Sequence, residues 1–401
     1  MIKLKKEKDM IRHLFKLIWN KRRENILLTV EIIISFLVMF AVFTLLVSDF
    51  KNYNKPRGFE YQNVWVVRYS NPWQSTSTDS ANYYFENLKL RLASFPGVES
   101  LSFFADNFPY SSNDMTIGIS SINANSSANS YTVDDNFNKV FKLNIRKGRW
   151  FSKADIEARI KPVIISESLE EDLFESGNSL GKVIKYKNDE LKVIGVVTDF
   201  KKQGDYHAIE NKIFFQSDSS SFHIKDQLIL LSVKQDAAAN FEVSIFNCLD
   251  NYFKNADLKI DQLSDLRIKK NNLTLVPVIM LLIIVGFLIF NVALGLFGVL
   301  WFNINKRKSE IALRIAIGAS KSVIIKQIIA EAMVITTFSL IIGSFIALQF
   351  PLLNVFNILT DTYLYSFVIS ILFIYLIILV CALYPGFQAA KIYPANALHE
   401  D

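Results

Sequence analysis

Four long apolar runs constrain the fold of this chain more than any other feature of its sequence. They lie within residues 26–47, 273–303, 332–350 and 364–386. Each is long enough for a helix that crosses the hydrocarbon core of a bilayer, which takes about 20 residues. None of the runs alternates between apolar and polar residues, so we expect helices and not the strands of a barrel. The sequence therefore predicts an α-helical membrane protein with four transmembrane helices.

Lysine and arginine residues indicate on which side of the membrane each connecting segment lies, because cytoplasmic loops carry an excess of them. Nine lie in residues 1–25 and six in residues 304–331, whereas residues 351–363 hold none. We therefore place both termini, 1–25 and 387–401, and the loop 304–331 in the cytoplasm. Residues 48–272 and the short loop 351–363 then lie outside. The first segment has apolar side chains on one helical face, which predicts an amphipathic helix at the membrane surface.

The distribution of charge excludes a nucleic-acid partner. The chain holds 44 Lys and Arg against 38 Asp and Glu, a net charge of +6. The excess lies beside the apolar runs, since residues 48–272 hold 28 basic and 29 acidic residues. We therefore expect the basic residues to face membrane lipid. The two cysteines, Cys248 and Cys381, provide no disulfide framework.

The outside segment is long enough for a packed domain. One β-α-β unit is predicted near its start and a second near its end. Their elements are strand 64–69, helix 81–95, strand 98–104, strand 228–234, helix 240–253 and strand 258–261. Two such units predict a split ferredoxin-like part, and residues 106–226 between them predict a mostly β insertion. The expected fold class is thus four transmembrane helices plus an α+β extracytoplasmic domain inserted between helices 1 and 2.

The sequence provides no motif for catalysis. The segment from Gly177 to Val183 imitates a phosphate-binding loop, but only three residues separate Gly177 from Gly181, and Val183 stands where Ser or Thr is needed. An ordinary β-turn is the better interpretation. His207 and Glu210 have no third ligand near them in sequence, so a metal site is not expected. We predict no catalytic, cofactor-binding or metal-ligating residue.

Three residues within the apolar runs, two polar ones and a glycine, are candidates for contacts between helices or subunits. Glu31 lies about 8 Å inside the first run at the rise of an α-helix. Its side chain either makes a buried polar contact between helices or reaches back to Arg22 or Arg23. Asn291 and Gly295 in the second run are candidates for a close helix–helix or dimer contact, because small residues let backbones approach.

The cytoplasmic loop carries the most informative string, Lys306 to Glu331. It predicts a short helix through Ile317, a stop at Gly318 and an N-cap at Ser320 for the next helix. Glu310 and Arg314 are four residues apart and can pair on one helical face. Taken alone, the string is a basic connector that keeps the loop in the cytoplasm.

This string resembles the signature loop of FtsX-like ABC permeases. The matching residues are Glu310, Ile311, Arg314, Gly318, Ala319, Ser320 and Glu331. The C-terminal segment resembles the closing motif of that family through Pro385, Ala389, Ala390, Lys391, Pro394, Ala397 and Leu398. The outside segment resembles the MacB-type periplasmic core domain in residues 148–151, 162–166, 173–174, 180–182 and 193–200. The resemblance covers essentially the whole chain.

The resemblance implies a permease subunit of a MacB-like, type VII ABC system in the inner (cytoplasmic) membrane. It implies a second permease subunit, identical or different, and separate ABC ATPase subunits that bind ATP and Mg²⁺, so that this chain itself holds no cofactor. It further implies that ATP-driven motion is transmitted to the outside domain, not that substrate passes between the helices. The residues implied to couple to the ATPase are Glu310, Arg314, Gly318, Ala319 and Ser320.

Several functions stay open within this family. They are efflux of peptides, toxins or antimicrobials, with a periplasmic adaptor and an outer-membrane channel as further partners, lipoprotein release of the Lol type, and regulation of cell-wall hydrolases of the FtsX type. MacB proper carries its ATPase on the same chain, and this sequence shows none. The alternative from another class is a membrane-anchored sensor whose outside domain binds a peptide. Against the sensor, the cytoplasmic parts have only about 25, 27 and 15 residues.

Overall fold

The computed structural model describes residues 22–70, 78–104, 107–174, 177–217, 226–235, 240–253, 257–353, 355 and 358–393. The chain forms two compact units. The helical unit comprises Met1–Phe50 and Leu275–Asp401, and the α+β unit comprises Lys51–Thr274. Most of the expected amphipathic helix, in residues 1–21, lies outside the described residues, as do Pro394, Ala397 and Leu398 of the C-terminal motif.

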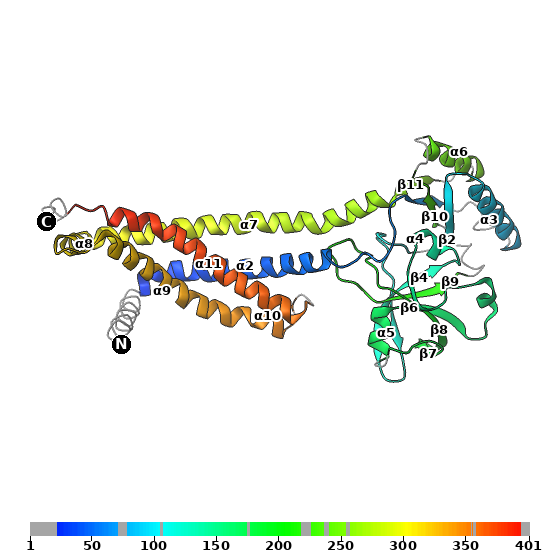
Figure 1. The fold of residues 1–401 in the computed structure, drawn as a ribbon, viewed down its shortest axis with the longest axis horizontal. Helices are drawn as coiled ribbons and strands as arrows, with labels where there is room; N and C mark the ends of the chain where they lie inside the picture. The colour runs from blue at the N-terminus through cyan, green and yellow to red at the C-terminus, as the bar shows by residue number, and fades with distance from the viewer. Residues whose placement is uncertain are drawn as a thin grey trace. The chain divides into compact units, whose positions relative to one another are not determined.

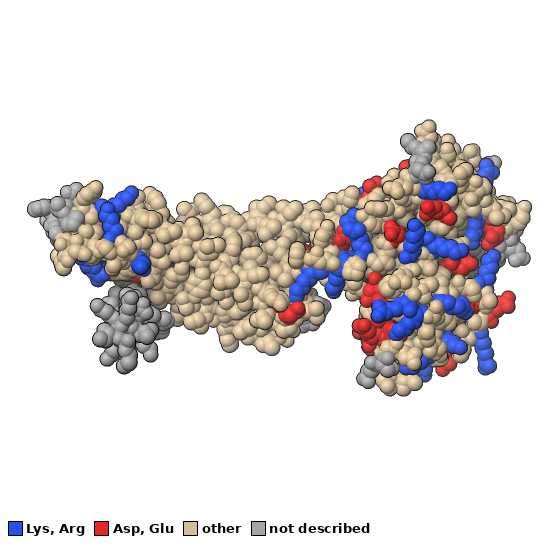
Figure 2. All heavy atoms as spheres, viewed as in Figure 1, with Lys and Arg blue, Asp and Glu red and all other residues tan. Residues whose placement is uncertain are grey.

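Four helices are long and apolar enough to cross a membrane, as the apolar runs predict. They are α2 (Arg22–Tyr53), α7 (Leu263–Lys306), α9 (Lys321–Ala347) and α11 (Thr360–Ala389). Two short helices, α8 (Lys308–Ala316) and α10 (Gln349–Leu352), accompany them (Figure 1). In Figure 2 the middle of the helical unit is almost free of charged side chains on the face shown, whereas Lys, Arg, Asp and Glu are spread over the α+β unit.

Aromatic packing holds α2 against α9 and α11. Phe36 and Phe40 of α2 both meet the ring of Phe367 on α11 edge-on, at centroid distances of 6.1 and 6.2 Å. On α9, a Cβ at Gly343 would lie 2.8 Å from the Phe36 ring, so only glycine lets the two helices come this close. Phe36 and Phe40 belong to the apolar core of the helical unit, and Phe367 packs against that core.

The first sheet of the α+β unit has the strand order β11-β1-β10-β2, with antiparallel pairing throughout. Its strands are β1 (Val64–Ser70), β2 (Val98–Phe104), β10 (Asp226–Val233) and β11 (Leu258–Gln262). Helix α3 (Thr78–Ala93) connects β1 to β2, and α6 (Phe241–Phe253) connects β10 to β11. Leu88 of α3 and Leu249 of α6 are buried in one core with Val67 and Ile229 of the sheet. This is the ferredoxin-like arrangement that the two β-α-β units predict.

The second sheet lies between β2 and β10 in the chain and has the order β5-β8-β6-β9-β4-β3-β7. Its strands are β3 (Thr116–Ser120), β4 (Asn125–Val133), β5 (Ile145–Gly148), β6 (Lys161–Ser166), β7 (Val183–Tyr186), β8 (Asp189–Val197) and β9 (Lys212–Gln216). Strand β7 also pairs with β8, which closes six of the strands into a ring. Helices α4 (Phe137–Phe141) and α5 (Glu167–Leu173) and the 3-10 turn η1 (Lys153–Glu157) accompany this sheet.

Two glycines explain local features of the second sheet. Gly181 has φ +77° and ends the turn before β7, so the segment that imitates a phosphate loop is a turn. Gly195 pairs with Gly148 across β8 and β5, and a Cβ at Gly195 would lie 2.4 Å from the carbonyl oxygen of Arg149. Both positions therefore need glycine for structural reasons.

Candidate functional site

The connector between α7 and α9 contains the short helix that the sequence predicts. Helix α8 ends at Ala316, and Gly318 follows with φ +102°. The amides of Gly318 and Ala319 donate to the carbonyls of Ile315 and Arg314, which is the bonding pattern of a Schellman motif. Ser320 is the N-cap residue of α9, but its hydroxyl makes no capping bond and contacts the hydroxyl of Ser322 at 3.1 Å.

Five polar side chains form a closed ring that ties α8 to α9. Arg307, just before α8, donates to Glu310 at 3.0 Å and to Glu331 at 2.9 Å. Arg314 donates to Glu310 at 2.5 Å, which confirms the predicted pair, and to Gln327 at 2.7 Å. Gln327 completes the ring by donating to Glu331 at 3.2 Å. A single charge reversal at Glu310 or Arg314 therefore disrupts a contact inside the chain as well as any contact with a partner.

Within the part of the chain that the structure describes, one face of α8 presents exposed apolar side chains beside the ring. Ile311 and Ala312 are buried against the helical unit, whereas Leu313 is 51% and Ile317 77% exposed. Leu313 and Ile317 are four residues apart and lie on the same face, with exposed Ala316 between them. This apolar face was not predicted from the sequence, although the helical spacing of positions 313, 316 and 317 was a usable signal.

Glu31 contacts the neighbouring helix α7. A Cβ at Gly295 would lie 2.4 Å from the Oε2 atom of Glu31, so the carboxylate lies directly over the glycine. This geometry favours the interpretation that Glu31 makes a polar contact between helices. The side chains of Arg22 and Arg23, the alternative partners, are not among the side chains that the structure describes. Asn291, one turn from Gly295, donates to the carbonyl oxygen of Phe287 at 2.8 Å and so bonds within its own helix.

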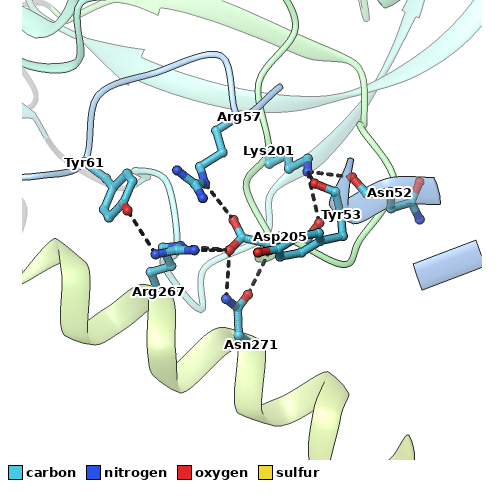
Figure 3. Close-up of polar contacts among 8 residues, drawn as sticks. All are labelled: Asn52, Tyr53, Arg57, Tyr61, Lys201, Asp205, Arg267 and Asn271. Carbon is cyan, nitrogen blue, oxygen red and sulfur yellow. Dashed lines mark hydrogen bonds and ion pairs between the residues drawn. The ribbon is translucent and has the colours of Figure 1, made fainter. Parts of the chain in front are cut away.

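A second polar cluster, inside the α+β unit, was not found from the sequence. It surrounds Asp205, whose side chain accepts hydrogen bonds from Arg57, Arg267 and Asn271 (Figure 3). Burial alone would raise the pKa of Asp205, but the bonds from Arg267 and Asn271 and the nearby positive charges hold the pKa below its usual value. Asp205 is therefore ionised at neutral pH.

This cluster lies within the α+β unit, which runs from Lys51 to Thr274 and so includes the last residues of α2 and the first residues of α7. Arg57, Arg267 and Asn271 lie outside the predicted strands and helices, which begin at residue 64 and end at residue 261, and they join the unit through Asp205. Periodicity could not reveal this, because the contacting residues are 62 to 148 positions apart.

His207, which the sequence offers with Glu210 as a possible metal ligand, contacts α7 near its N-terminal end. Its Nδ1 atom lies 3.3 Å from the hydroxyl of Thr274. Burial lowers the pKa of His207, with a smaller opposing effect from Glu210. Among the residues that the structure describes, no group of three or more His, Cys, Asp or Glu side chains could hold a metal ion.

Along the chain, an α+β domain lies between two long apolar helices, and a charged connector and two further apolar helices follow. This order defines the class of membrane permeases with a large domain beside the membrane. Two family models match the chain accordingly. The MacB-like periplasmic core domain matches residues 27–243, and the FtsX-like permease C-terminal domain matches residues 282–394. The first match alone spans more than half of the chain. The chain belongs to the MacB-type family of ABC transporter permeases.

Curated relatives of two kinds match the chain. The "Macrolide export ATP-binding/permease protein MacB" of Aggregatibacter actinomycetemcomitans is 25% identical over 268 residues, which is 64% of this chain and 40% of that protein. The "Uncharacterized ABC transporter permease YvrN" of Bacillus subtilis is 22% identical over 290 residues, which is 67% of this chain and 69% of that protein. The match thus spans less than half the length of MacB.

Solved structures of outside domains from this family also match. The periplasmic region of MacB from Actinobacillus actinomycetemcomitans is 18% identical, with a TM-score of 0.37 and coverage of 55% of this chain and 98% of that one. The extracellular domain of YknZ, described as a noncanonic ABC-type transporter from Gram-positive bacteria, is 15% identical, with a TM-score of 0.32 and coverage of 49% and 99%.

Proposed function

We propose that this chain is the permease subunit of an ABC exporter and that it transmits ATP-driven motion from a cytoplasmic ATPase to its α+β unit. The observation that carries the proposal is the geometry of α8. The polar ring fixes the helix against α9, while Leu313 and Ile317 face outward beside the exposed Arg314. A helix that is fixed by polar contacts and presents exposed apolar side chains beside them is suited to enter a groove on a partner.

The proposed topology places α8 in the cytoplasm and the α+β unit outside the cytoplasmic membrane. Support comes from the basic residues Lys306, Arg307 and Lys308 beside α8, because cytoplasmic loops carry such residues. The balanced charge of the α+β unit fits a domain that has crossed the membrane. In this arrangement the exposed face of α8 meets an ATPase that binds ATP and Mg²⁺.

The proposed assembly contains two permease subunits and separate ATPase subunits. Support for a second permease comes from α7, whose side chains Ile283 and Phe287 are largely exposed in the single chain and so are free to face lipid or another subunit. The word "export" in the name of the MacB relatives supports efflux as the activity. In an envelope with two membranes, an adaptor and an outer-membrane channel would complete the route.

The test of this function separates the exposed apolar side chains of α8 from the polar ring beside them. Leu313→Glu and Ile317→Glu change exposed side chains, so we expect the permease to insert and fold normally. Each variant should lose co-purification with the ATPase and ATP-dependent export, because a carboxylate would enter an apolar groove. Ile122→Glu, at a side chain 97% exposed on the α+β unit, is the matched control and should retain both. Normal co-purification and export in both α8 variants would contradict the proposal.

A further inference from the structure

The loop that follows β8 contacts the end of one long helix and the start of another. Residues 201–206 belong to the α+β unit, as do the last residues of α2 and the first residues of α7. Figure 3 shows Lys201 directed toward the end of α2 and Asp205 directed toward α7. Lys201 and Asp205 are both almost fully buried, each residue being 1% exposed. Buried lysine and aspartate are rare unless they have specific partners.

Lys201 is bonded to the C-terminal end of α2. Its ammonium group donates to the carbonyl oxygens of Asn52 at 2.6 Å and Tyr53 at 3.3 Å. These carbonyls belong to the last residues of α2, where a helix has unpaired acceptors and a partial negative charge. The backbone amide of Lys201 also donates to the carbonyl of Arg57, at 2.9 Å. The ring of Tyr206 stacks on the ring of Tyr53 with a centroid distance of 5.4 Å.

Asp205 is bonded to the beginning of α7. Arg267 donates to its carboxylate through two nitrogens, at 2.8 and 2.6 Å, and Asn271 donates at 3.0 Å. The amide of Asp205 in turn donates to Asn271 Oδ1 at 2.8 Å. Gly204, with φ +110°, lies so near α7 that a Cβ would be 2.9 Å from that same oxygen. Lys270 adds a bond to Gln203 at 3.0 Å.

Tyr61 links the two sets of contacts. Arg57 and Arg267 lie over its ring, at 5.1 and 4.8 Å from the centroid, and Arg267 donates to its hydroxyl at 3.0 Å. Arg57 reaches Asp205 from the α2 side, at 3.2 Å. Residues following α2 and residues within α7 therefore share the carboxylate of Asp205.

We propose that residues 201–206 form a clip that fixes the end of α2 to the start of α7, and that Asp205 is its positioning residue. The clip gives the two helices a common attachment to β8, at one point of the second sheet. The clip has a consequence that rests on the proposed function. Motion of α2 and α7 would reach the α+β unit through this loop.

Spin labels at exposed Lys55 and Lys269 in the full-length chain, with Cys248 and Cys381 replaced by alanine, test the clip in lipid nanodiscs. Dipolar EPR should give a narrow distance distribution for the otherwise unchanged chain and a broad one for Asp205→Ala. Asp205→Asn keeps the side-chain volume, so we expect this variant to fold. Its distance distribution should also be broader than that of the otherwise unchanged chain. Asp155→Ala is the matched control, because Asp155 is also buried and paired with an arginine, Arg149, but lies away from α2 and α7.

An unchanged distribution in folded Asp205→Asn and Asp205→Ala would overturn the clip, as would equal broadening in Asp155→Ala. The second arm adds the ATPase and ATP and follows hydrogen exchange. In the unmodified chain ATP should alter exchange in residues 51–57, 263–274 and β8, and in Asp205→Asn the change should not reach β8. A change that still reaches β8 would overturn the role of the clip in transmission. If ATP does not alter hydrogen exchange in the unmodified chain, the proposed function is contradicted. The EPR comparison then still tests whether residues 201–206 fix α2 to α7.

Discussion

The carboxylate of Glu31 on α2 lies against the Cα of Gly295 on α7, at a point where a Cβ would be 2.4 Å from Oε2. The glycine removes the side chain that would separate the two helices, and the half-buried glutamate occupies the space. A polar side chain in an apolar helix is costly unless it is shielded or paired. The contact therefore gives a structural reason for a glycine at position 295 of α7.

Enlarging Gly295 should separate α2 from α7. We expect Gly295→Leu to lower the thermal stability of the purified chain, because the new side chain would overlap the Glu31 carboxylate and force a shift, at a cost of about 1–3 kcal/mol. The double variant Glu31→Ala with Gly295→Leu should recover part of the loss. Gly298→Leu is the control, since a Cβ there meets no described atom within 4 Å. Equal losses at both glycines would show that the contact with Glu31 is not the cause.

Replacing Gly195 should weaken the second sheet. In Gly195→Ala the new Cβ meets backbone, the carbonyl oxygen of Arg149, so β5 and β8 must move apart at a cost of about 1–3 kcal/mol. Gly118→Ala in β3 has open space and should be neutral or stabilising by up to about 1 kcal/mol. Urea unfolding of the α+β unit measures both. Comparable stability in the two variants would contradict the interpretation of Gly195 as a close backbone approach.

Lys212 should make the α+β unit more stable in mildly alkaline solution. Burial lowers its pKa to about 8, against opposing effects of Asp199 and Glu210 and a further lowering by Lys202. The unfolded chain keeps the ordinary lysine pKa of about 10.4, so between these two values the unfolded state binds more protons and the free energy of unfolding rises with pH. Below pH 8 this contribution is constant.

The variant Lys212→Met isolates this effect. We expect its unfolding free energy to change less between pH 8 and 10 than that of the unmodified chain, because the titrating group is gone while a side chain of similar length fills the site. Chemical unfolding of both proteins across that pH range provides the measurement. Identical pH dependence in the two proteins would mean that Lys212 does not titrate there.

The limits of the α+β unit should decide its stability as a separate fragment. A fragment of residues 51–274 retains Arg57, Arg267 and Asn271, whereas a fragment of residues 59–263 lacks these three partners of Asp205. Loss of these bonds should make the shorter fragment less stable, by up to about 3–5 kcal/mol if Asp205 stays buried, so that it unfolds at a lower urea concentration. Asp205→Ala should destabilise the longer fragment more than the shorter one. Equal stability of the two fragments would contradict the assigned boundary.

The sequence by itself determined the features that depend on local pattern. The four long helices follow from uninterrupted apolar length, and the strands and helices of the ferredoxin-like part follow from alternation and helical spacing. The pair of Glu310 and Arg314 was also predictable, because residues four apart on one helix must be neighbours. In each case the interacting groups are close in sequence, so secondary structure alone brings them together.

Only the tertiary structure decided the contacts between segments that are distant in sequence. Three of these contacts have no local signature in the sequence. They are the bonds that add Gln327 and Glu331 to the ring, the contact of Glu31 with Gly295, and the shared carboxylate of Asp205. Asp205 lies in a loop, where periodicity carries no information, and its partners come from segments on either side of the whole domain. Their position is set by how two sheets and two helix ends pack, and that packing depends on the complete fold.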